Sequence, residues 1–112
     1  MIQEFLPHDF WNQFDFSDGE IHFMYTSPEE DLLFVTYPDR LSLDAGYLYD
    51  GTFGIYISWD NNCPPVARYV CKTIEDFAEL MQIALEQIQT ELEQRRFSYY
   101  GELWKTIEII RL

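Results

Sequence analysis

Carboxylates and large aromatic side chains alternate over residues 41–60, and this combination suits the binding of a positively charged partner. Tyrosine and tryptophan offer rigid contact area at small entropic cost, and acids around them attract a basic protein. Ordinary packing in the core and across strands is the alternative for the aromatic residues. The candidate partner-binding residues of this stretch are Asp44, Tyr47, Tyr49, Asp50, Tyr56, Trp59 and Asp60.

A second acidic surface is expected on a helix over residues 73–96. Solvated helix faces commonly pair Glu with Lys four residues away, whereas this face has no Lys or Arg, which favours a role in binding for Glu75, Glu79 and Glu86. Simple solvation of a charged face is the alternative. The complete stripe reads Glu75, Glu79, Gln82, Glu86, Gln89 and Glu93.

Sequence motifs for catalysis are missing. The chain contains no GxGxxG, no P-loop lysine motif, no HExxH and no GxSxG. A Cys–His pair would have to come from Cys63 or Cys71 with His8 or His22, and nothing in the sequence brings them together. The two cysteines do not form a CxxC pair, so a zinc site is not expected. We therefore expect no enzymatic activity, no cofactor and no bound metal.

The long helix is the element around which the rest of the chain is organised. Gaps of three and four separate its apolar residues, which gives one apolar face. Thr73 is placed to cap the helix, with Asp76 at the position of an acid in a capping box. The apolar positions are Ile74, Phe77, Met81, Ala84, Ile88 and Leu92, flanked by Leu80 and Leu85.

The remaining segments predict a sheet that this helix covers. Strands are expected over residues 20–25, with Ile21, Phe23 and Tyr25 on one face, and over residues 32–37, 41–49, 53–59 and 66–72. Asp50-Gly51 suits the turn of a tight hairpin. Residues 5–16 fit a short helix or the start of a strand, and residues 103–111 fit a closing strand or a short amphipathic helix. Because the connections between strands are short, we expect antiparallel neighbours.

The predicted fold class is therefore α+β: an antiparallel β-meander of about five or six strands with one long helix, residues 73–96, packed on one face. The length of 112 residues suits one domain, residues 1–112, with one hydrophobic core.

Net charge is −13, and most of it lies in the first part of the chain. Residues 1–67 contain 12 acids and one base, Arg40, whereas residues 68–112 contain eight acids and six bases. Such a field repels nucleic acid and anionic membranes and speeds encounter with a basic partner; the alternative is that it only keeps the protein soluble. Since no apolar run reaches about 20 residues and the N-terminus lacks a signal-peptide pattern, we expect a cytoplasmic protein.

The chain resembles the small acidic immunity proteins of bacterial toxin systems, including contact-dependent inhibition. The resemblance lies in its size, its acidic balance, the meander-plus-helix pattern and the helix entry Thr73-Ile74-Glu75-Asp76-Phe77. It implies a cytoplasmic protein that binds a cognate toxin domain, often a basic nuclease, and blocks its active site or an essential surface. No site residues are carried over from these families.

Two other functions remain open on the sequence. A nucleic-acid mimic, as in anti-restriction or anti-CRISPR proteins, would place carboxylates where phosphates bind and would compete directly with DNA or RNA. A small enzyme or ligand-binding domain would require a deep pocket that gathers His22 or a cysteine with carboxylates.

Overall fold

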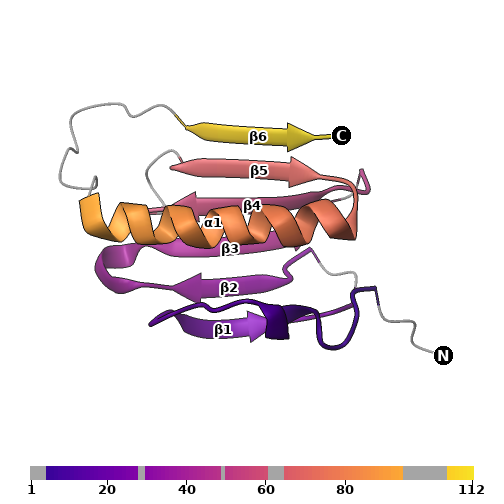
Figure 1. The fold of residues 1–112 in the computed structure, drawn as a ribbon, viewed down its shortest axis with the longest axis horizontal. Helices are drawn as coiled ribbons and strands as arrows, with labels where there is room; N and C mark the ends of the chain where they lie inside the picture. Colours follow the sequence, from indigo (N-terminus) through magenta and orange to yellow (C-terminus); the bar gives the residue numbers. More distant parts are fainter. Residues whose placement is uncertain (1–4, 28–29, 49, 61–64, 95–105) are drawn as a thin grey trace.

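A six-stranded sheet with one long helix on one face makes up the computed structural model of the protein (Figure 1), which confirms the predicted α+β class. The structure describes residues 5–27, 30–48, 50–60, 65–94 and 106–112. The elements are the 3₁₀ turns η1 (Phe10–Gln13) and η2 (Pro38–Arg40), the helix α1 (Ile74–Gln94), and the strands β1 (Glu20–Met24), β2 (Leu33–Thr36), β3 (Ser42–Tyr47), β4 (Phe53–Ser58), β5 (Ala67–Cys71) and β6 (Ile107–Arg111).

The strands follow one another across the sheet in chain order. The neighbours from β1 to β5 pair antiparallel, as predicted, but β6 pairs parallel with β5. The expectation of antiparallel pairing throughout is therefore wrong for the last strand. The physical reason is α1, which carries the chain back along the sheet before β6 begins, so that β6 runs in the same direction as β5.

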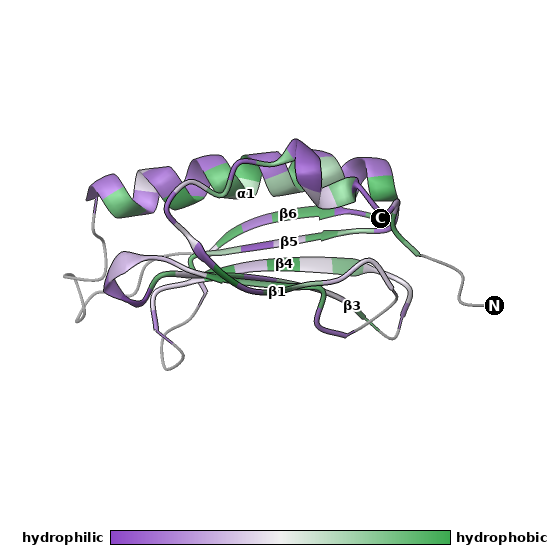
Figure 2. Cartoon of the chain, turned by 90° about the horizontal axis from the view of Figure 1, so that it is seen from below, coloured by the Kyte–Doolittle hydropathy of each residue, from purple (hydrophilic) through white to green (hydrophobic). Residues whose placement is uncertain are grey.

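The helix α1 covers the sheet with the apolar face that its sequence predicts (Figure 2). Its first turn is capped by the Thr73 hydroxyl, which accepts a hydrogen bond from the Asp76 backbone N–H at 3.1 Å. Phe77, Met81 and Ile88 are completely buried, together with the inward residues of β3, β4 and β5. No helix within the described ranges is long and apolar enough to cross a membrane.

The segment before β1 adds aromatic side chains to the helix side of the sheet. Of the two options for residues 5–16, the short helix is correct, since η1 forms there. The ring of Phe10 stacks on that of Phe77 in α1 at 5.5 Å, and the Trp11 indole N–H donates to the Tyr25 carbonyl at 2.9 Å. These contacts close the core along the β1 side.

A β-bulge in β1 changes which side chains share a face. Ile21 pairs with Val35, whereas Phe23 pairs with Phe34, the next residue towards the start of β2, so the register shifts between Ile21 and Phe23. Val35 is buried on the helix side, so Ile21 lies on that side and Phe23 on the opposite one. The expectation that Ile21, Phe23 and Tyr25 share one face is therefore wrong for Ile21, whereas Phe23 and Tyr25 do lie together, with their rings stacked at 5.4 Å.

Candidate functional site

The face of the sheet that points away from α1, here called the open face, is the candidate binding surface. Figure 2 shows α1 on one side of the sheet, with no described helix on the other. Strand register places one row of side chains across this face, because residues directly opposite each other in paired strands share a face. The row consists of Phe23, Phe34, Asp44, Tyr56, Arg68 and Glu108.

An acidic recess lies near the middle of this row. Asp31, at the end of the β1–β2 connection, and Asp44 line a cavity of about 170 Å³ together with Tyr56 and Gly46. Burial raises the pKa of the Asp44 carboxyl, and the negative charge of Asp31 raises it further. Among the described side chains no Lys or Arg forms an ion pair with either carboxylate. The recess is therefore lined by three acidic residues, Glu30, Asp31 and Asp44.

Two glycines that pair across β3 and β4 give the recess its shape. A Cβ atom on Gly46 would collide with the backbone carbonyl of Glu30, so the β1–β2 connection can lie directly on the sheet here. A Cβ atom on Gly54 would lie 3.0 Å from the ring of Tyr56. Because Gly54 has no side chain, this ring can lie down along the sheet.

A wider groove, of about 530 Å³, continues along the open face beyond Phe34. Its floor includes Thr36 and Ser42, and its rim carries Arg40, whose guanidinium forms an ion pair with Asp60 at 3.2 Å. Arg40 has a positive φ of 68°, which is uncommon for a residue with a side chain. On the β1 side, His22 shares a 2.8 Å hydrogen bond with the Thr36 hydroxyl.

Three of the seven candidate residues in residues 41–60 lie on the open face. Asp44 and Tyr56 are direct cross-strand neighbours, and Asp60 lines the wider groove. Asp50 lies instead in the β3–β4 turn, where its carboxylate accepts hydrogen bonds from the Thr52 backbone N–H at 3.1 Å and the Thr52 hydroxyl at 2.6 Å. Tyr49 lies outside the described residues.

The other two aromatic candidates lie on the helix side of the sheet. The Tyr47 ring is half-buried against Phe5 and Phe53. Trp59 is only 1% exposed, so the expectation that it contributes to an exposed surface is wrong. The reason is strand alternation: β4 buries Phe53, Ile55 and Ile57, and Trp59 continues the same series.

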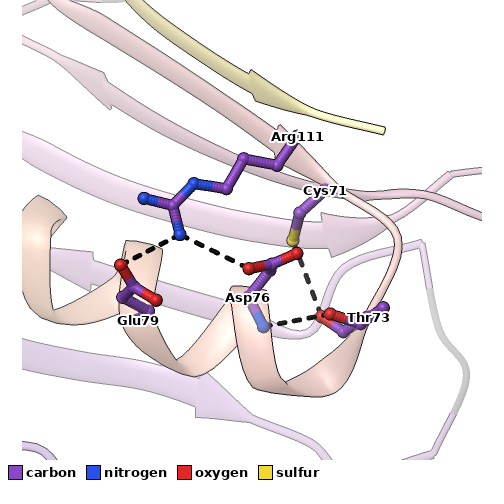
Figure 3. A network of polar contacts seen from close by, with 5 residues as sticks. All are labelled: Cys71, Thr73, Asp76, Glu79 and Arg111. Atoms are coloured by element: carbon purple, nitrogen blue, oxygen red, sulfur yellow. Dashed lines mark hydrogen bonds and ion pairs between the residues drawn. The ribbon is translucent and has the colours of Figure 1, made fainter.

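The acidic stripe of α1 forms a separate surface on the far side of the molecule. Glu75, Glu79 and Glu86 are all exposed there. However, Arg111 of β6 reaches the helix and pairs with Glu79 at 3.0 Å and with Asp76 at 3.4 Å (Figure 3). Helix α1 itself therefore contributes no Lys or Arg to the stripe, but Arg111 of β6 neutralises part of its negative charge.

Glu91 is an important residue that the sequence analysis did not assign to the core. Its side chain is completely buried, and its carboxylate accepts hydrogen bonds from the Trp59 indole N–H at 3.1 Å and the Gln87 side-chain amide at 2.8 Å. Its spacing, three residues after Ile88, places it on the apolar face and is a usable signal. Asp31 and Phe34 lie outside residues 41–60, the stretch in which the sequence pattern predicts a binding surface.

Cys71 is the cysteine that the described part of the chain contains, and it is the last residue of β5, just before α1. Cys71 is buried as a free thiol, and its Sγ lies 3.8 Å from the Thr73 carbonyl oxygen (Figure 3). Burial, together with the charge of Asp76, raises the pKa of this thiol to about 11, so little nucleophilic thiolate exists at neutral pH. No group of three His, Cys, Asp or Glu side chains in the described ranges is placed to hold a metal ion.

Comparison of this chain with protein-family models, with curated proteins and with solved structures gives no match.

Proposed function

We propose that this protein binds and inhibits a basic protein partner, and that the open face of its sheet is the binding surface. The partner class we favour is a toxin domain, which would make the chain a cytoplasmic immunity protein. The observation that carries the proposal is the recess in which Asp31 and Asp44 lie beside the ring of Tyr56.

The chemistry of this recess suits a lysine or arginine side chain of the partner. An arriving cation would relieve the repulsion between Asp31 and Asp44 and would lie against an aromatic ring, which attracts cations through its π face. An arginine could pair with a carboxylate through two parallel hydrogen bonds. Phe34, the cross-strand neighbour of Asp44, would add apolar contact beside the charge.

Long-range charge supports the same partner. With a net charge of −13, the protein attracts a basic surface over distances comparable to the Debye length, about 10 Å at 0.1 M salt. Association should therefore be fast at low salt and slower at high salt. Burial of aromatic and aliphatic side chains would then determine how long the complex lasts.

A nucleic-acid mimic remains a second candidate, favoured by the outer surface of α1. Glu75, Glu86 and Glu93 are exposed along one helix face, as a row of phosphates would be on a nucleic acid. A mimic of this kind would occupy a nucleic-acid groove through α1, whereas the first proposal uses the opposite side of the molecule. The two functions therefore predict different sensitive residues.

The experiment that tests the proposed function is an affinity pull-down from a lysate of the source organism, washed at low and at high salt. The bait is compared with two variants that lose the same charge: Asp31→Asn with Asp44→Asn, and Glu86→Gln with Glu93→Gln. We expect the wild type and the helix variant to retain one basic protein at low salt, and the recess variant to lose it. Loss with the helix variant, together with competition by DNA or RNA, would favour the mimic. Equal recovery with all three baits would exclude both surfaces.

A further inference from the structure

The outer edge of β6 has the properties of a strand that pairs with another strand. β6 is the outermost strand on its side of the sheet (Figure 1). The Ile107 backbone N–H donates to the Val66 carbonyl at 2.9 Å, so the backbone groups of Ile107 point towards β5. Backbone direction alternates along a strand, so the N–H and C=O groups of Glu108 and Ile110 point outward.

Exposed apolar side chains gather on the same segment. Of the large hydrophobic residues that are exposed in the described part of the chain, three lie here: Ile107 at 36%, Ile110 at 47% and Leu112 at 73%, whereas Ile21 and Tyr25 lie on and beside β1 at the other edge. Edge strands in monomeric proteins usually carry charges, prolines or bulges that discourage pairing. β1, at the other edge of the sheet, has such a bulge, whereas the pairing of β6 with β5 is regular over all five residues.

Charge makes β6 the edge at which a second copy of this acidic chain can approach. Around β6 the charges are close to balanced, since Arg68 pairs with Glu108 at 2.9 Å and Arg111 pairs with both Glu79 at 3.0 Å and Asp76 at 3.4 Å. The region up to residue 67, which includes β1, carries 12 acids and one base. Two copies would therefore repel each other strongly through β1 and only weakly through β6.

The register centred on Ile109 satisfies both the backbone and the side chains. In a two-fold antiparallel pair that continues the sheet, Ile109 would face its own copy, and Glu108 would face Ile110 of the second chain. The outward backbone groups of Glu108 and Ile110 would then exchange hydrogen bonds in both directions. In a register with Glu108 opposite Glu108 of the second chain, two negative charges would face each other, which is unfavourable.

We propose that β6 pairs antiparallel with β6 of a second copy of this chain, joining two sheets into one. The contact area of a single strand edge is small, so the dimer is expected to be weak and dependent on concentration. The proposed dimer does not depend on the toxin partner. Salt should affect the dimer and the complex with a basic partner in opposite directions. Salt screens the repulsion between two acidic copies and should strengthen the dimer, whereas it should weaken binding to a basic partner.

Sedimentation velocity of the purified protein over a range of concentrations, at low and at high salt, tests the proposal. The wild-type mass should rise from 13.5 kDa towards twice that value, more readily at high salt. Ile110→Pro removes an outward N–H and no hydrogen bond to β5, so this variant should stay at the monomer mass. Ile110→Thr keeps the N–H and should still dimerise. A wild type that stays monomeric throughout, or an Ile110→Pro variant that dimerises as readily as the wild type, would overturn the proposal.

Disulfide trapping tests the register without relying on a proline variant. In a Cys63→Ser background, Ile109→Cys should form a covalent dimer on mild oxidation, because the two introduced thiols face each other in a pair without backbone hydrogen bonds. Glu108→Cys is the matched control, since it would face Ile110 of the second chain. Equal cross-linking of the two variants, or none with Ile109→Cys, would contradict the proposed pairing.

Discussion

The indole N–H of Trp59 donates a hydrogen bond of 3.1 Å to the carboxylate of Glu91, and both side chains are almost completely buried. This contact joins the residue after β4 to the last turns of α1, where the helix lies over the sheet. Gln87, one turn earlier in α1, donates to the second carboxylate oxygen at 2.8 Å. A buried carboxylate is tolerated only when such donors replace water, and the hydrogen bond from Trp59 links α1 to the end of β4.

Removing the Glu91 carboxylate should lower the free energy of unfolding much more than removing a nearby surface carboxylate. We expect Glu91→Ala to lower the free energy of unfolding by about 3 kcal/mol, because the Trp59 indole N–H and the Gln87 amide would lose this buried acceptor and a cavity would form. Glu91→Gln keeps an acceptor oxygen and should cost about 1 kcal/mol. Urea denaturation followed by circular dichroism measures both. Glu93→Ala, on the exposed face, is the control, and an equal loss for it would refute a special role of Glu91.

The two paired glycines should respond differently to the same added methyl group. Gly46→Ala places its Cβ against the Glu30 backbone carbonyl, which cannot rotate away, so we expect a loss of about 2–3 kcal/mol. In Gly54→Ala the atoms nearest to the new Cβ belong to the side chain of Tyr56, which can turn aside, so the cost should stay near 1 kcal/mol. Thermal unfolding of the two variants tests this order. A Gly46→Ala variant as stable as Gly54→Ala would mean that the β1–β2 connection does not lie on the sheet.

Asp44 should reduce stability at neutral pH. Burial and the charge of Asp31 raise the pKa of Asp44 in the folded protein, so folding favours the protonated acid. The stability that Asp44 contributes is therefore present in acid and is lost as pH rises through its folded pKa. Asp44→Asn should stabilise the protein at pH 7 by on the order of 0.5 kcal/mol, since solvent screens part of the effect. This gain should vanish in acid, where the carboxyl is protonated in both states. A gain that is constant with pH would not come from the charge.

Removing the N-cap of α1 should cost the free energy that is typical of helix N-caps. Thr73→Ala removes the hydroxyl that accepts from the Asp76 N–H, and we expect a loss of about 1 kcal/mol. Thr73→Ser keeps the hydroxyl and should cost only a few tenths of a kcal/mol. Chemical denaturation of both variants checks the difference. If alanine and serine behave alike, the hydroxyl does not contribute to stability.

Local patterns were sufficient to predict most of the fold. The helix follows from one apolar face and the Thr73 cap, and the β3–β4 hairpin follows from alternation on both sides of Asp50-Gly51, where Gly51 adopts a φ of 84°. Both features are local, so neither depends on distant contacts. The parallel pairing of β6 was not predicted, because strand direction depends on where α1 returns the chain.

The candidate site could be predicted only in part, because its residues come from segments distant in sequence. Alternation placed Tyr56 and Asp44 on one face, but the recess also needs Asp31, which the β1–β2 connection brings there. The base-free stripe on α1 was visible in the sequence, whereas the ion pairs of Arg111 with it were not. The β-bulge in β1 could not be predicted, because the alternation of apolar and polar residues does not indicate it.

The most direct test of the central claim is the rate at which the recovered basic partner associates with this protein, measured by stopped-flow or surface plasmon resonance at low and at high salt. Asp31→Asn with Asp44→Asn should slow association and weaken the complex at low salt, whereas Glu86→Gln with Glu93→Gln, which removes the same charge from α1, should change binding much less. High salt should reduce the difference in association rate between the variants. Equal effects of the two double variants would contradict the claim that the open face, and the recess within it, forms the binding surface.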